Sequence, residues 1–91
     1  MEWRASHILV QDRTLAQELL KKAKSGANFS NLAADYSTCP SKSRGGDLGW
    51  FGPGQMVPPF EEAVMRMGVG SISGIVTTRF GLHIIKLTGK R

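Results

Sequence analysis

Two histidines and one cysteine are the residues of this chain best suited to acid, base or nucleophilic chemistry. His7 lies in the stretch WRASHILV, Cys39 in STCPSKSRGG and His83 in GLHIIKLTG. A cysteine with a histidine base forms a common nucleophilic pair, so these residues leave a covalent mechanism open. A zinc site requires three or four ligands, and the three residues have no local pair spacing. We therefore expect no metal, and the sequence suggests no cofactor.

Both histidines are bracketed by large apolar residues, which predicts that each ring is buried within a strand. A buried imidazole without a hydrogen-bond partner is costly, so each ring needs a polar neighbour. Adjacent strands would let His7 and His83 bond to one another, with Thr77 or Thr78 as a further partner. The alternative is that both are ordinary core histidines with a structural role.

The glycine-rich segment at residues 45–60, GGDLGWFGPGQMVPPF, does not match a phosphate-binding loop. Gly52 and Gly54 begin a G-x-G pattern, but Val57 occupies the position of the third glycine, and no G-x-x-x-x-G-K-[ST] sequence occurs. The segment therefore does not predict nucleotide binding. It leads to Met56 and Phe60, two residue types that most often belong to an ordinary core.

Composition limits the domain organisation and the partners. A chain of 91 residues suits one domain, which we expect to span residues 1–91. No apolar run approaches the roughly 18 residues of a membrane span, so no membrane association is expected. The 12 Lys and Arg residues exceed the 7 Asp and Glu residues, giving a formal charge of +5. Nucleic acid is still not an expected partner, because the basic residues lack interleaved aromatic residues.

Hydrophobic periodicity predicts one strand and two helices in the first half of the chain. Residues 3–10 are rich in strand formers and carry apolar groups on both faces, as in a central strand. Residues 14–25 show the apolar stripe of an amphipathic helix, and Gly26 suits its end. Asn28 is a suitable N-cap for a short second helix, whose apolar residues recur at helical spacing.

The second half adds a loop, one helix and three strands. The 37–47 loop is polar, with room for a short extra helix, and leads to the short strand LGWF. Pro59 suits the first position of a third helix that ends before Gly68. SGIVTT and GLHIIKLTG predict two strands joined by RFG. The fold class is therefore α+β, with the order βααβαββ and a sheet of four strands.

Three strings in this order and spacing resemble the parvulin family of peptidyl-prolyl cis/trans isomerases: SHILV, CPSKSRGGDLGWFGPGQMVPPFEEA and FGLHIIKL. The resemblance runs from about Ser6 to Leu87. It implies a four-stranded antiparallel sheet surrounded by helices, with a shallow site that binds peptides containing proline. The glycine-rich segment would then shape one wall of an apolar pocket for that proline.

The resemblance also implies two sets of site residues. The histidines pair, and Thr78 supports them. Met56 and Phe60 belong to the floor of the proline pocket, and Phe80 should make the pocket more apolar. The catalytic set is His7, Cys39, Thr78 and His83, and the substrate-binding set is Leu48, Gln55, Met56, Phe60 and Phe80.

Rotation about an X-Pro peptide bond breaks no covalent bond, and both isomers of that bond are populated. A site that binds the twisted amide better than either planar isomer lowers the barrier without a nucleophile. We therefore predict a non-covalent peptidyl-prolyl isomerase that assists protein folding. It would act as a monomer on proline-containing peptides and on unfolded or partly folded proteins. The alternative is a chaperone module that holds proline-containing segments without useful turnover.

The substrate is predicted to need no phosphate group. Parvulins that require phosphoserine or phosphothreonine carry a long basic insertion after the first strand, whereas here QDR at residues 11–13 joins strand and helix directly. Arg13 alone cannot supply the several charge-assisted hydrogen bonds that a dianionic phosphate needs. Lys42, Arg44 and Arg79 are expected near the site, where they would tolerate an acidic residue.

The sequence also bears on location. The first ten residues, MEWRASHILV, lack the positively charged start, apolar stretch and cleavage site of a secretory signal. Taken as complete, the chain is expected to be cytoplasmic. The single Cys39 cannot form an internal disulfide, which fits a reducing compartment. A fragment of a secreted foldase would fit these features equally well.

Overall fold

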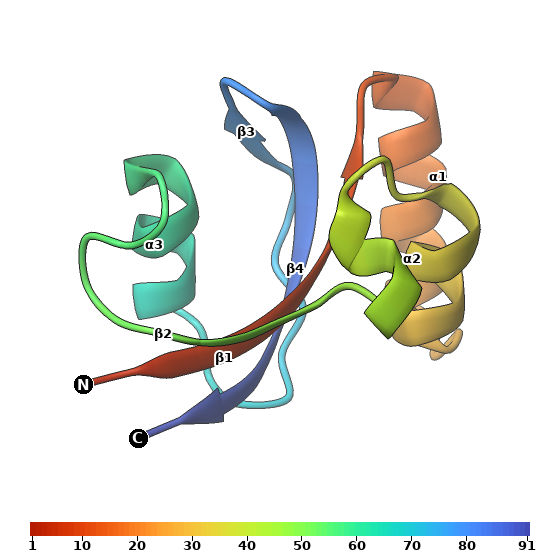
Figure 1. The fold of residues 1–91 in the computed structure, drawn as a ribbon. Coiled ribbons are helices and arrows are strands. Elements are labelled where there is room, and N and C mark those ends of the chain that lie inside the picture. The colour runs from red at the N-terminus through yellow and green to blue at the C-terminus, as the bar shows by residue number, and fades with distance from the viewer.

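The computed structural model describes residues 1–91 as one sheet with helices on both faces (Figure 1). This architecture confirms the predicted α+β class and element order, and the 3₁₀ helix η1 is the extra short helix expected in the 37–47 loop. None of the helices combines the length and the apolar character needed to cross a membrane. The elements are β1 Trp3–Val10, α1 Arg13–Lys24, α2 Phe29–Tyr36, η1 Pro40–Arg44, β2 Asp47–Phe51, α3 Pro58–Met65, β3 Val76–Thr78 and β4 Gly81–Lys90.

The sheet is antiparallel throughout, with the strand order β2-β1-β4-β3. β1 is a central strand, as its apolar residues on both faces predict. The first and last strands of the chain are therefore neighbours, which brings His7 and His83 to adjacent strands. Figure 1 shows the two chain ends side by side, and there the Arg91 N–H donates to the Glu2 carbonyl at 2.8 Å.

Alternating side chains of β1 and β4 build two separate apolar clusters, one on each face of the sheet. Figure 1 shows α1 and α2 on one side of these strands and α3 on the other. Each face therefore has its own core and its own helical cover. On the α1/α2 face the strands contribute Ile8, Val10, Leu82 and Ile84. On the α3 face they contribute Trp3, Ala5, Ile85 and Leu87, together with Phe51 of β2.

Several boundaries differ from the predictions by a residue or more, and two of these differences have a clear physical reason. The third helix begins at Pro58 rather than Pro59, because neither proline needs an N–H partner in the first helical turn. β3 covers only Val76–Thr78, not the whole of SGIVTT. The preceding residues still follow β4, but the Ser73 hydroxyl accepts the Ile85 N–H at 3.0 Å. The Ser73 hydroxyl takes the place of a backbone hydrogen-bond acceptor at this point, so the regular hydrogen-bond ladder between β3 and β4 begins later in the chain.

Candidate active site

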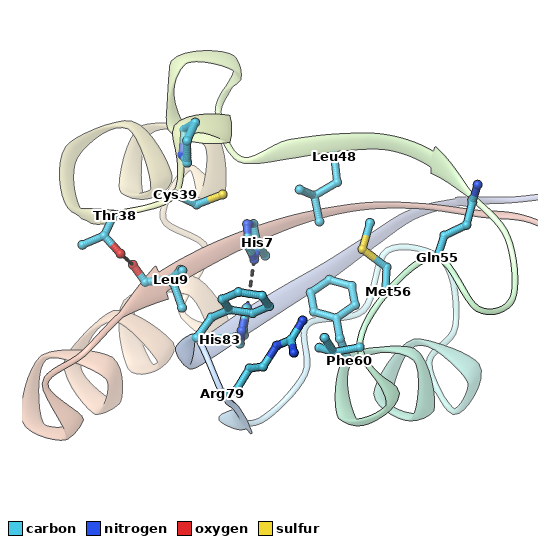
Figure 2. A pocket seen from close by; sticks show the side chains of 13 residues that line it. His7, Leu9, Thr38, Cys39, Leu48, Gln55, Met56, Phe60, Arg79 and His83 are labelled. Atoms are coloured by element: carbon cyan, nitrogen blue, oxygen red, sulfur yellow. Dashed lines mark hydrogen bonds between the residues drawn. The ribbon is translucent and has the colours of Figure 1, made fainter.

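A pocket of about 460 Å³ opens on the α3 face of the sheet, beyond the part that α3 covers (Figure 2). Along β1 the residues on this face pass from Trp3 and Ala5 in the core to His7 and Leu9 in the pocket wall. His83 of β4 lies opposite Leu9 in the register. The pocket is thus the continuation of an apolar core at the point where its helical cover ends.

The structure brings together almost all of the predicted site residues. Thr78 is the exception, since it does not line the pocket but bonds to His83 from β3. None of the glycines lines the pocket either; they shape the backbone that carries its wall residues. The predicted residues that line the pocket are His7, Cys39, Leu48, Gln55, Met56, Phe60, Phe80 and His83.

The two histidines bond to one another, as their burial in neighbouring strands predicts. The register pairs His7 with Ile85 and His83 with Leu9, so the two histidines are diagonal neighbours. Their Nδ1 atoms lie 3.0 Å apart, and the rings are stacked with centroids 5.1 Å apart. Figure 2 shows this contact as a dashed line between the two strands.

Thr78 completes the hydrogen bonding of His83. Its Oγ1 lies 2.7 Å from His83 Nε2 and accepts the Phe80 N–H at 3.1 Å. Thr77, the other expected partner, is exposed and takes no part. The turn between β3 and β4 is therefore attached to the histidine pair through one hydroxyl.

Phe60 forms an apolar floor beneath both histidines. Its ring meets His7 and His83 edge-on, with centroids 5.8 and 5.5 Å away. Phe60 is only 2% exposed, and α3 holds it in place near the helix start. The loop before α3 is attached to the same helix, because the Gly54 N–H donates to Glu61 Oε1 at 2.7 Å. Met56 and Phe60 therefore hold fixed positions around the pocket.

Both histidines are neutral at neutral pH. Burial, and then repulsion from His83, lowers the pKa of His7 from its ordinary value of 6.5 to about 4. Burial also lowers the pKa of His83. Each ring consequently carries one proton, and the pair presents hydrogen-bonding dipoles rather than a positive charge.

Cys39 lies half-buried at the start of η1, on the opposite wall of the pocket from Arg79 in Figure 2. Its N–H donates to Ser37 Oγ at 3.3 Å. Three ring nitrogens of the histidines bond to other groups, and the fourth, His7 Nε2, has no partner. The thiol is therefore not hydrogen-bonded to a histidine base, and the geometry lacks the pair that a covalent mechanism needs.

Gly46 allows β2 to approach the first histidine closely. A Cβ at this position would lie 2.4 Å from the His7 carbonyl oxygen, and its φ of +84° also disfavours other residues. The His7 N–H donates to the Gly46 carbonyl at 3.0 Å. This glycine thereby sets the distance between β1 and the wall that carries Leu48.

Sequence reasoning missed four lining residues: Leu9, Thr38, Pro40 and Val57. Simple signals could have found them. Leu9 is two residues after His7 on the same face of a strand, and the other three are sequence neighbours of Cys39 or Met56. Of the three basic residues expected near the site, Arg79 lines the pocket, whereas Lys42 and Arg44 do not.

The four-stranded sheet with paired neutral histidines above an aromatic floor agrees with the parvulin-type domain that the sequence resemblance implies. Consistent with this, a family model described as Rotamase, PPIC-type PPIASE domain, matches residues 7–89. The chain therefore belongs to the PPIC-type peptidyl-prolyl isomerase family, the parvulins. The match confirms the resemblance that the three sequence strings indicate.

Similar proteins include longer foldases and small parvulins. The foldase protein PrsA of Geobacillus kaustophilus is 56% identical over 88 residues, covering 96% of this chain and 31% of that foldase. The crystal structure of PrsA from Bacillus anthracis matches with a TM-score of 0.97 and 49% identity over 99% of this chain and 42% of the other. NmPin, the parvuline of Nitrosopumilus maritimus, matches with a TM-score of 0.85 and 40% identity over 97% of this chain and 96% of the other.

The chain spans about a third of the length of the curated relatives it matches. This chain therefore matches only one part of the longer PrsA protein. The match with NmPin covers nearly the whole of both chains. The family match identifies the chain as a peptidyl-prolyl isomerase domain.

Proposed function

We propose that the pocket binds the proline of an X-Pro segment and accelerates rotation of the preceding peptide bond without a covalent intermediate. The observation that carries this proposal is the neutral histidine pair above Phe60, in a pocket whose cysteine has no histidine base. Leu48, Met56 and Phe60 supply the apolar surface that suits a proline ring. The family match does not favour the alternative of a chaperone without turnover.

The proposed mechanism depends on differential binding of the twisted amide. The planar amide is stabilised by resonance, and the rotation barrier is about 18 to 20 kcal/mol. The twisted amide has lost that resonance, so a water-poor apolar site favours it over the planar forms. A thousandfold acceleration requires only about 4 kcal/mol of such preference.

Each catalytic residue has a proposed part in that preference. The His7–His83–Thr78 network keeps the pocket in shape and presents neutral dipoles to the amide. Cys39, on the η1 wall, lies beside the bound amide and tunes its electrostatic environment. Gln55 and Phe80 contact the residues that flank the proline, since both line the pocket rim.

A broad substrate preference without a phosphate requirement follows from the charges around the pocket. Arg79 is the one residue with an ionised side chain among those that line it. One exposed arginine cannot offset the desolvation of a dianionic phosphate. Only Gln11 and Asp12 separate β1 from α1, and Asp12 is occupied as the N-cap of that helix. Apolar and unmodified residues before proline should therefore be accepted.

The proposed partners are proline-containing segments of unfolded or partly folded proteins, which fits the relatives described as foldases and as SurA-like chaperones. We also propose that the domain acts as a monomer. The predicted cytoplasmic location gains no support from the comparisons. The curated relatives are longer foldases. One similar structure is described together with a periplasmic protein.

The decisive experiment is exchange spectroscopy on a short X-Pro peptide with substoichiometric protein. We expect faster cis/trans exchange, whereas line broadening without exchange would favour the holding chaperone. Met56→Ala removes a pocket residue and should slow the exchange several-fold. Met65→Ala is the matched control, because this methionine is 58% exposed and does not line the pocket.

A further inference from the structure

Arg79 is a cation at the mouth of the pocket that has no acidic partner. It lies in the turn between β3 and β4, is exposed, and is the single ionised residue of the pocket lining. The structure contains two ion pairs without Arg79, which join Arg4 to Asp47 and Arg91 to Glu2. None of the lining residues is an aspartate or a glutamate. The guanidinium is therefore available to a charged group of a bound molecule.

The turn that carries Arg79 is held in place through both backbone groups of the next residue. The Phe80 N–H donates to Thr78 Oγ1 at 3.1 Å, and the side-chain amide of Gln11 donates to the Phe80 carbonyl at 2.8 Å. A Cβ at Gly81 would lie 2.9 Å from a backbone oxygen at the end of β1, so the turn packs directly against that strand. These contacts fix the backbone from which the arginine extends.

The Phe80 ring supports the guanidinium of Arg79. Arg79 Cζ lies 5.0 Å from the ring centroid, within the range of a cation–π contact. Figure 2 shows Arg79 extending from its turn toward Phe60, with its charged end at the pocket. Phe80 is itself 51% exposed, so the pair forms an ordered feature of the pocket rim. The arginine consequently has less conformational freedom to lose when a ligand binds.

A carboxylate is the ligand group that suits this arrangement. A guanidinium is planar and always charged, and its N–H donors form a fork that matches the two oxygens of a carboxylate. The contact with Phe80 is made to a ring and not to an acceptor oxygen, so these donors remain available to a ligand. A dianionic phosphate would require further donors, and Lys42 and Arg44 do not line the pocket. A carboxylate carries one charge, which one guanidinium can pair.

We propose that Arg79 is a specificity-determining residue that pairs with the carboxylate of an aspartate or glutamate directly beside the substrate proline. The favoured clients are therefore acidic proline-containing segments of unfolded or partly folded proteins. The formal charge of +5 on the domain favours the approach of the same segments. The proposal rests on the proposed function, since the proline in the pocket is what brings the acidic residue to Arg79.

The first test compares kcat/KM for peptides that differ only in carrying Glu, Gln or Lys beside the proline. One series places this residue before the proline, and a second series places it after. We expect the wild-type domain to favour Glu over Gln about threefold in at least one series, because an exposed ion pair contributes little. The gain should appear mainly in KM, since the pair forms in the ground state and the transition state alike.

Charge reversal and salt identify the residue that causes the preference. Arg79→Gln should remove the preference for Glu, and Arg79→Glu should favour Lys instead. Arg66→Gln is the matched control and should keep the preference, because Arg66 is exposed but does not line the pocket. Raising NaCl from about 0.05 M to about 0.5 M should also weaken the preference. The proposal fails if the wild type shows no preference for Glu, or if Arg79→Glu keeps it.

The second test needs no turnover and follows the Nε–H resonance of Arg79 by NMR while the Glu or the Gln peptide is added. We expect this resonance to shift further with the Glu peptide. That shift without faster cis/trans exchange would refute the isomerase function and leave the Arg79 assignment standing. Faster exchange on both peptides, without a Glu preference or the shift, would support the isomerase and overturn the Arg79 assignment. Binding of neither peptide would overturn both.

Discussion

The two faces of the β1–β4 strand pair contrast in almost every property, although their residues alternate along the same strands. On one face Ile8 and Ile84 are fully buried under α1 and α2. On the other, one residue away, His7 and His83 are buried with their hydrogen bonds directed at each other. The first face is closed by two helices, and the second has one helix and then an open pocket.

This contrast separates stability from function within one strand pair. The apolar face gains free energy from area removed from water and needs no specific geometry beyond close packing. The histidine face depends on the hydrogen bonds that three of its ring nitrogens make, and this network also shapes the pocket. The predictions below therefore distinguish damage to packing from damage to the network.

The largest effect is expected on the apolar face. Ile84→Ala should lower the free energy of unfolding by about 4 kcal/mol, because it leaves a cavity under α1 and α2. Denaturant unfolding measures this, and kcat/KM of the folded fraction should change less than about twofold. Val69→Ala, at a residue that is 61% exposed, is the control and should change stability by less than about 0.5 kcal/mol. A large loss of kcat/KM in folded Ile84→Ala would contradict the separation of the two faces.

Substitution of His83, next to Ile84 in β4, should damage both the packing and the hydrogen-bond network. His83→Ala removes a buried ring, leaves His7 Nδ1 without a partner and leaves the Thr78 hydroxyl only its bond from the Phe80 N–H. We expect a loss of about 3 to 4 kcal/mol in stability, with a clear fall in kcat/KM, measured by thermal unfolding and peptide exchange. A folded variant of unchanged stability and no activity would instead indicate direct acid or base catalysis by this ring.

The histidine face should also make stability depend on pH. The pKa of His7 is about 4 in the folded domain and near its ordinary value of 6.5 in the unfolded chain. Between these values the unfolded chain binds protons more readily than the folded domain does. The contribution of neutral His7 to the free energy of unfolding is therefore complete above pH 6.5 and is lost as pH falls toward 4. The loss should reach up to about 3 kcal/mol by pH 4. Urea unfolding at several pH values measures this loss of stability. His7→Gln should make stability depend less on pH. A wild-type stability that stays constant from pH 7 to pH 5 would contradict the prediction.

A smaller effect is expected from the cysteine on the η1 wall. Cys39→Ala should lower kcat/KM about tenfold, or ~1.4 kcal/mol, because it changes the surroundings of the amide without removing a reacting group. Ser43→Ala, in the 3₁₀ helix that follows Cys39, serves as the control. Complete loss of activity in folded Cys39→Ala, or after thiol alkylation, would restore the covalent interpretation.

The smallest effect concerns the residue before proline. Matched peptides with Leu, Glu, Ser and phosphoserine at that position should differ in kcat/KM by less than about fivefold, or ~1 kcal/mol. The reason is that Arg79 is the single ionised residue of the pocket lining. A hundredfold preference for phosphoserine over Ser and Glu, about 2.7 kcal/mol, would mean that Lys42 and Arg44 form a phosphate site after all.

Much of the fold could be predicted because the relevant signals are local. The alternating and helical periodicities located every helix and strand to within a few residues, apart from the first half of SGIVTT. That exception arises from Ser73, whose hydroxyl takes a backbone position in the ladder to β4. Local propensity does not reveal a side chain that substitutes for the backbone.

The sequence by itself determined which residues to propose for the site, since the spacing of the motifs groups His7, Cys39, Met56, Phe60 and His83 into one recognisable set. Only the tertiary structure decided how those residues meet. The contact between the two Nδ1 atoms, the choice of Thr78 over Thr77 and the isolation of His7 Nε2 all depend on strand register. Register is a property of β1 and β4 together, 76 residues apart at the histidines, and a shift of one residue would move every side chain to the other face.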